Sequence, residues 1–200
     1  MTRWLAAAFL VACAWLAVDH FVLARPVARG PGVVAAREPA QAPVGRDALV
    51  FAKDGFRITA LALFDLEARV LRSRSYCCGG PDRLAPVDVA FGWGRMSDEA
   101  VLARIDVSQS GRFYHWRYAG SPPIPHREIE LSSANMHLIP ATKAIEKKLK
   151  NLRPGNVVAL RGYLVDVRDE GGFRWTSSLT RDDTGGGACE LVWVEEVEVS

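Results

Sequence analysis

The chain has 200 residues, a formal net charge of +2, 49% hydrophobic residues and 24% charged residues. This length fits one domain plus a targeting segment and excludes two full domains. The nearly balanced charge gives no electrostatic basis for a polyanionic partner, so we expect no nucleic acid to bind.

Residues 1–24 are predicted to direct the chain to a membrane. Arg3 supplies a short cationic start, and the stretch from Trp4 to Val18 contains no charged residue. Asp19 and His20 interrupt the apolar run, which then resumes up to Ala24. This pattern is typical of a signal peptide or of an anchor that crosses the bilayer as a hydrophobic helix, and the sequence leaves both outcomes open.

The expected location is the inner membrane, with the domain on its periplasmic side. A short cationic start followed by an apolar core normally sends the following chain outward. The alternative is a cytoplasmic domain, because Arg25, Arg29 and Arg37 follow the apolar segment and positive charge favours the inner side. The predicted partners are therefore the membrane, through residues 1–24, and an unidentified small ligand or envelope protein.

Residues 25–55 are rich in Ala, Pro, Arg and Gly and lack helical or strand periodicity, so they are predicted to form a tether. Residues 56–200 are then the globular domain. Its first strand is expected where apolar and charged residues alternate from Phe64 to Val70. A short strand at 87–91 and a short helix from Ser97 to Arg104 follow.

The second half of the domain alternates between predicted strands and one clear helix. Strands are expected at the aromatic run 113–118 and at 128–131, where Ile and Leu alternate with Glu. A helix is expected from about Pro140 to Leu152, with an apolar stripe on one side. Further strands are predicted at 157–167, where Gly162 indicates a bend, at 173–178 and at 190–199.

Short strands around one conspicuous helix predict a mainly β (α+β) fold, a small OB-like barrel or sandwich preceded by an N-terminal hydrophobic helix. The stretch from Leu152 to Val167, in which a helix leads into a bent strand, looks like the entry to the later strands of an OB-fold.

Four segments stand out for their density of polar and aromatic residues. They are GWGRMSD (92–98), SQSGRFYHWR (108–117), SSANMHLIP (132–140) and SSLTRDDTGGGACE (177–190). With these segments in this order, the chain resembles an uncharacterised family of membrane-associated bacterial proteins over about residues 56–199. That resemblance implies a membrane-associated location and carries no known activity.

The leading functional hypothesis is a non-catalytic ligand-binding or partner-binding face. In that role arginines grip anionic or carbonyl groups, aromatic rings stack, and an amide fixes orientation. The predicted binding residues are Arg95, Arg112, Tyr114, Trp116, Asn135, His137 and Arg181.

The alternative is an envelope hydrolase that uses His137 or His115 as a base with a nearby Ser or Asp. Such an arrangement is recognised by geometry, and the chain carries no Gly-x-Ser-x-Gly elbow that would expose a nucleophile. A His and a carboxylate or hydroxyl in contact within a pocket would favour the hydrolase, whereas an open surface would favour binding.

No cofactor and no metal ion are expected, because the histidines show none of the close pairs typical of zinc ligands. The chain has four cysteines. Cys13 lies in the apolar segment, where Leu10 to Cys13 also matches a lipidation motif, although the apolar residues beyond it favour a buried thiol. In an oxidising compartment Cys77 or Cys78 could pair with Cys189, and the predicted disulfide is Cys78–Cys189.

Overall fold

The computed structural model describes residues 25–45, 49–77, 79–180 and 188–200. The chain is mainly β, with one large sheet and few helices, which confirms the predicted class. Its strands are β1 (Ala40–Pro43), β2 (Val50–Lys53), β3 (Phe56–Ser75), β4 (Val87–Gly92), β5 (Asp106–Ser110), β6 (Phe113–Arg117), β7 (Ser133–Pro140), β8 (Val157–Arg168), β9 (Arg174–Thr176) and β10 (Glu190–Val199). The short helices are α2 (Gly80–Leu84), the 3-10 turn η1 (Gly94–Ser97), α3 (Glu99–Leu102), α4 (His126–Leu131) and α5 (Lys143–Lys150).

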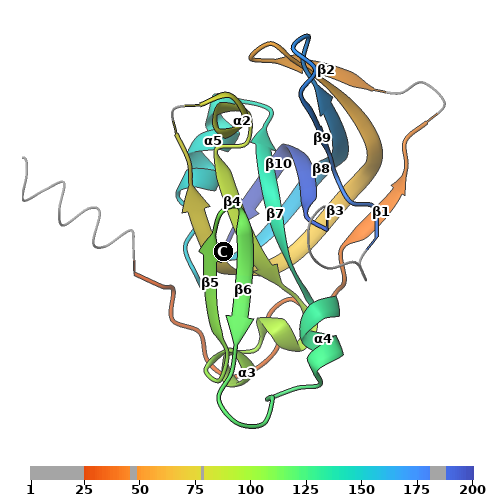
Figure 1. The fold of residues 1–200 in the computed structure, drawn as a ribbon. Coiled ribbons are helices and arrows are strands. Elements are labelled where there is room, and N and C mark those ends of the chain that lie inside the picture. Colours follow the sequence, from red (N-terminus) through yellow and green to blue (C-terminus); the bar gives the residue numbers. More distant parts are fainter. Residues whose placement is uncertain (1–24, 46–48, 78, 181–187) are drawn as a thin grey trace, which may run out of the picture.

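The strand pairings lead around the large sheet and back to their start (Figure 1). β3 pairs with β4, β4 with β7, β10 with β8, and β8 again with β3, all antiparallel. β7 and β10 are parallel neighbours. β1 and β2 add to β3, and β9 adds to β8.

The alternating residues of the long strands fill the interior of this sheet. Phe64, Leu66 and Ala68 of β3 are buried together with Leu160 and Leu164 of β8. One side chain in two therefore faces the same core, as the alternation predicts for a strand with one buried face. Phe64 to Val70, predicted as a strand, lies within β3, so that prediction is confirmed.

The conspicuous helix is also confirmed, with a later start than expected. Pro140 still belongs to β7, and α5 begins after Thr142, whose Oγ1 accepts a hydrogen bond from the Ile145 amide at 3.2 Å. Ile145 and Leu149 bury the apolar face of α5 against the core. Thr142 is the N-cap that fixes where the helix starts.

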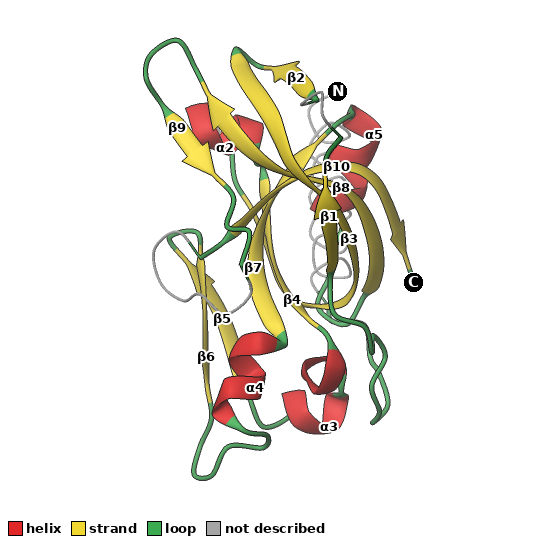
Figure 2. Cartoon of the chain, turned by 90° about the vertical axis from the view of Figure 1, so that its right-hand side faces the viewer, coloured by secondary structure: helices red, strands yellow, loops and turns green. Residues whose placement is uncertain are grey.

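The segment between β4 and β7 folds back over the outer face of the sheet. β5 and β6 form a separate two-stranded hairpin, which lies beside β4 and β7 in both views (Figure 1, Figure 2). The predicted strand at 128–131 is wrong, because these residues lie in α4. An alternation of four residues is too short to distinguish a strand from one helical turn, and only Ile129 is fully buried there.

Residues 25–55 differ from the extended tether that their composition suggests. The Val27 amide donates to the Pro154 carbonyl at 2.7 Å, and Arg29 Nε donates to the Gly155 carbonyl at 2.8 Å. Ala35 is buried, and β1 and β2 both belong to the large sheet. Within the described residues no helix has the length and apolar character to cross a membrane. The predicted targeting segment 1–24 lies outside those residues.

Candidate functional site

Three of the predicted binding residues, Arg112, Asn135 and His137, converge on the outer face of β4 and β7. The residue that joins them is Asp88, which the sequence analysis did not select. Two aromatic residues, Tyr76 and Trp175, line the same spot. We refer to Tyr76, Asp88, Arg112, Asn135, His137 and Trp175 as the Asp88 cluster.

Asp88 and His137 are direct partners across the sheet. Strand pairing sets Asp88 opposite His137, and their side chains leave the sheet on the face away from the main core. His137 Nδ1 lies 2.9 Å from Asp88 Oδ1, with exposed side-chain fractions of 5% and 0%. An ionised carboxylate only accepts hydrogen bonds, so Nδ1 carries a proton, and in the neutral form of the ring Nε2 presents a lone pair. The one hydrogen bond of the His137 ring within the described part of the chain is that of Nδ1, so Nε2 is left without a protein partner there.

Arg112 reaches the same carboxylate from the tip of the β5–β6 hairpin. Gly111 and Arg112 form a two-residue turn with φ values of 55° and 65°, the left-handed pair that such tight hairpins require. Arg112 donates to Asp88 Oδ1 at 2.8 Å, to Asp82 Oδ1 at 2.6 Å and to the Ala85 carbonyl at 3.1 Å. A non-glycine residue is unusual at this turn position, because a positive φ costs energy when a Cβ is present. The hydrogen bonds of the Arg112 side chain offset that cost.

Asn135 holds the hairpin in place over the pair. Its Nδ2 donates to the Arg112 carbonyl at 3.0 Å, and its Oδ1 accepts from Gln109 Nε2 at 2.8 Å. Asn135 therefore orients the turn that carries Arg112, and both halves of its amide are used. The sequence hypothesis that this amide fixes orientation fits its geometry, although the group that it orients is the protein's own hairpin.

Aromatic rings form the walls of the Asp88 cluster. The guanidinium of Arg112 lies 4.2 Å from the centre of the Tyr76 ring and 5.2 Å from that of Trp175. The Trp175 ring also packs against the His137 imidazole, with centroids 4.8 Å apart. Tyr76 follows β3 and Trp175 lies in β9, so a loop and a terminal strand of the large sheet supply these walls.

The polar atoms of the Asp88 cluster are only partly satisfied. Asp88 Oδ2 and the Tyr76 hydroxyl are both buried without a hydrogen-bond partner among the described residues. Burial raises the pKa of the Tyr76 phenol, and the negative charge of Asp88 raises it further. The Arg112 guanidinium lies between two carboxylates, Asp82 and Asp88, and the Arg74 guanidinium lies 5.5 Å from the centre of the Tyr76 ring, so carboxylates and guanidiniums balance around the cluster.

The other predicted binding residues lie elsewhere or are engaged. Arg95 pairs with Glu128, which raises the pKa of Arg95, and Trp116 packs against Tyr118 and His126. Tyr114 bonds Ser133 at 2.7 Å, one outer-face position beyond Asn135, and burial raises its pKa. Arg181 lies outside the described residues.

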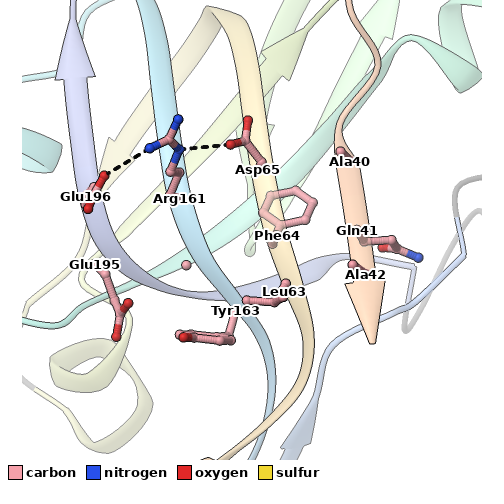
Figure 3. A pocket seen from close by; sticks show the side chains of 11 residues that line it. Ala40, Gln41, Ala42, Leu63, Phe64, Asp65, Arg161, Tyr163, Glu195 and Glu196 are labelled. Carbon is pink, nitrogen blue, oxygen red and sulfur yellow. Dashed lines mark hydrogen bonds and ion pairs between the residues drawn. The ribbon is translucent and has the colours of Figure 1, made fainter. Parts of the chain in front are cut away.

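A separate groove of about 370 Å³ opens between β1, β3, β8 and β10 (Figure 3). Leu63 and Tyr163 form an apolar wall, and Arg161 crosses it to Asp65 at 3.0 Å and towards Glu196 at 3.7 Å. Since its cation is already paired with carboxylates and exposed to solvent, this groove offers less chemistry than the Asp88 cluster.

No group of three or more His, Cys, Asp or Glu side chains that could hold a metal ion occurs among the described residues. Cys77 is exposed, and Cys78, a member of the predicted disulfide with Cys189, lies outside the residues that the structure describes. Comparison of the chain with protein-family models, with curated proteins and with solved structures gave no match.

Proposed function

We propose that this chain is an envelope protein with an OB-like barrel that binds an oligosaccharide on the outer face of β4 and β7. The observation that carries the proposal is the buried Asp88–His137 pair, which leaves His137 Nε2 beside an aromatic wall without a partner from the described residues. We keep the inner membrane, periplasmic side, as the proposed location, with residues 1–24 as signal or anchor.

The strand order supports an OB-like barrel. β3, β4 and β7 form an antiparallel series, β10 joins β7 in parallel, β8 closes the path to β3, and α5 connects β7 to β8. OB-folds bind oligonucleotides and oligosaccharides on the face of their second and third strands, and with the loops after the first and fourth. The corresponding elements are β4, β7, the β3–β4 loop with Tyr76 and Asp82, and the β8–β10 connection with Trp175. The Asp88 cluster is built from these same elements and from the hairpin that covers them.

The chemistry of the cluster suits a neutral ligand with hydroxyl groups. The lone pair of His137 Nε2 accepts a hydrogen bond from a ligand donor, and the half-buried Trp175 ring offers a flat apolar surface. A sugar ring provides both a hydroxyl donor and an apolar face. Arg112 already pairs with Asp82 and Asp88 and is not available to a phosphate backbone, so among OB ligands an oligosaccharide is favoured over a nucleic acid.

Calorimetric titration of the full chain in detergent tests this proposal, with chitotriose and maltotriose as probes. We expect one of these sugars to bind, and His137→Gln to weaken that binding about tenfold, because the ligand hydroxyl loses its acceptor. The matched control is His126→Gln, which removes an exposed imidazole from the other aromatic group around Trp116.

Two results would overturn the proposal. One is no heat of binding with either sugar for a chain whose circular dichroism shows it folded. The other is binding that His126→Gln abolishes and His137→Gln leaves unchanged, since that would place the sugar on the Trp116 side.

A hydrolase is the second candidate, and the Asp88–His137 pair favours it as well. A carboxylate that holds the Nδ1 proton of a histidine leaves Nε2 ready to act as a general base. No serine hydroxyl bonds His137 among the described residues, so water would be the nucleophile. The other predicted base, His115, bonds Ser110 at 3.1 Å on the exposed hairpin. Shortening of the bound sugar over hours, lost in His137→Gln, would favour the hydrolase over binding alone.

A further inference from the structure

A second groove, which shares no lining residue with the Asp88 cluster, lies where the chain enters the domain. It has a volume of about 420 Å³ and runs between the N-terminal segment, the middle of β3 and the start of β5. Its apolar lining comes from Val27, Leu71, Leu102, Ile105 and Val107. Its cationic lining comes from Arg29, Arg69 and Arg72.

The arginines of this groove are not all neutralised. Arg69 pairs with Glu99, yet its buried Nε has no hydrogen-bond partner among the described residues. Arg72 is exposed and uses Nε to donate to the Val107 carbonyl at 2.8 Å, which leaves its two terminal nitrogens without a partner in the described part of the chain. The remaining acid, Asp106, pairs with Arg117. The groove therefore combines an apolar wall with excess positive charge.

The N-terminal segment fixes this groove close to residue 24. The Val27 amide donates a hydrogen bond to the Pro154 carbonyl. The Val27 carbonyl oxygen also lies so close to Gly155 that a Cβ on Gly155 would be 2.1 Å from it. The three Cα-to-Cα steps from Ala24 to Val27 span at most about 11 Å. If the apolar residues 4–24 lie in a membrane, as proposed above, the groove is held at the headgroup level.

We propose that this groove binds the phosphate of an anionic phospholipid headgroup. The terminal nitrogens of Arg72, aided by the positive charge of Arg69 and Arg29, bind the phosphate oxygens. The apolar lining takes the glycerol and the first carbons of the acyl chains. The inference rests on the proposed membrane anchor and is independent of sugar binding, because the two sites share no residue.

Thermal unfolding of the full chain in nanodiscs tests this inference. We expect the Tm to be about 3 °C higher in discs with one third phosphatidylglycerol than in discs of phosphatidylcholine alone. Arg72→Gln should abolish this difference. The matched control is Arg74→Gln, since Arg74 lies two residues along β3 and also donates to a backbone carbonyl of β5, from Nη1 to Gln109. The control should keep the full difference.

Each other outcome counts against the inference. Equal Tm values in both kinds of disc would overturn it. If Arg72→Gln and Arg74→Gln reduced the Tm difference equally, the lipid effect would be a general charge attraction and not binding at this groove. In detergent without lipid, 10 mM inorganic phosphate should raise the Tm by less than about 1 °C. A rise equal to that seen with phosphatidylglycerol would identify free phosphate as the ligand. Retained sugar binding in Arg72→Gln separates this test from that of the proposed function.

Discussion

Asp88 and His137 occupy opposite positions on β4 and β7, and Oδ1 of the one lies 2.9 Å from Nδ1 of the other. The same oxygen accepts a hydrogen bond from Arg112 at 2.8 Å. A carboxylate with no exposed surface is thus stabilised by one imidazole and one guanidinium that come from different elements of the fold. The stability of the domain and the form of His137 both depend on this carboxylate.

Asp88→Asn should destabilise the domain strongly. The asparagine amide carries no charge to neutralise Arg112, and only its oxygen can accept hydrogen bonds, while its NH2 group is a donor. We therefore expect a loss of about 3 kcal/mol in the free energy of unfolding. Urea unfolding measures this loss. Asp106→Asn removes a carboxylate whose pair with Arg117 is exposed, and it should cost less than about 0.5 kcal/mol. Equal losses in the two variants would contradict a special role for Asp88.

Arg112 should show an unusual preference for glycine over alanine. Both Arg112→Gly and Arg112→Ala remove the contacts with Asp88 and Asp82, but only alanine keeps a Cβ at a φ of 65°. We therefore expect the glycine variant to be more stable than the alanine variant by about 1 kcal/mol, as measured by urea unfolding. A more stable alanine variant would show that the turn relaxes to another conformation once the arginine side chain is absent.

Gly155→Ala should release the N-terminal segment. The new Cβ meets the Val27 carbonyl and adopts a φ of 90°, so we expect a loss of about 3 kcal/mol and faster hydrogen exchange at the Val27 amide. Gly172 has a φ of 89° with open space around it, so Gly172→Ala measures the destabilisation from positive φ alone, without a steric clash. We expect that loss to be about 1 kcal/mol. Close docking of the segment would be contradicted if both variants lost the same free energy of unfolding and hydrogen exchange at the Val27 amide were unchanged.

Glu146 should make a pH-dependent contribution to stability. Hydrogen bonds from Lys143 and then from Lys150 lower its pKa from 4.5 to about 2. A carboxyl group whose pKa is depressed by folding adds stability above its unfolded pKa, and this stability is lost as the pH falls from about 4.5 towards 2. Since both lysines are largely exposed, we expect about 1 kcal/mol. Glu146→Gln should be less stable by this amount at pH 7, with the difference shrinking below pH 4 in urea unfolding. A difference that is independent of pH would contradict the depressed pKa.

The sequence predicted β3, β4, β6, β8, β9, β10 and the main helix, because their apolar residues recur at the period of the element, but it missed β1, β2, β5 and β7. β8 and β10 lie where 157–167 and 190–199 were predicted, and Gly162 was expected to mark a bend. A Cβ at Gly162 would lie 1.8 Å from the Trp193 carbonyl oxygen, so this glycine allows a close approach of β8 and β10. The irregularity is in β10, between Val194 and Glu196.

The candidate site could be predicted only in part. Arg112, Asn135 and His137 were selected because their segments are rich in polar and aromatic residues. Asp88 was missed because a carboxylate that alternates with valines normally faces solvent on a half-buried strand. It is buried because the β5–β6 hairpin folds back over the sheet, and alternation along β4 carries no information about that contact. Trp175 is brought to the cluster by β9, which is equally non-local.

The most direct test of ligand binding at the Asp88 cluster is nitrogen NMR of the chain labelled with 15N-histidine, with and without chitotriose or maltotriose. We expect that in the free chain at pH 7 the His137 Nδ1 resonance is that of a protonated nitrogen and the Nε2 resonance that of an unprotonated one. Added sugar should shift the Nε2 resonance of His137 and leave the His126 resonances unchanged. A proton on Nε2 in the free chain, or a His137 signal that neither sugar moves, would contradict this expectation.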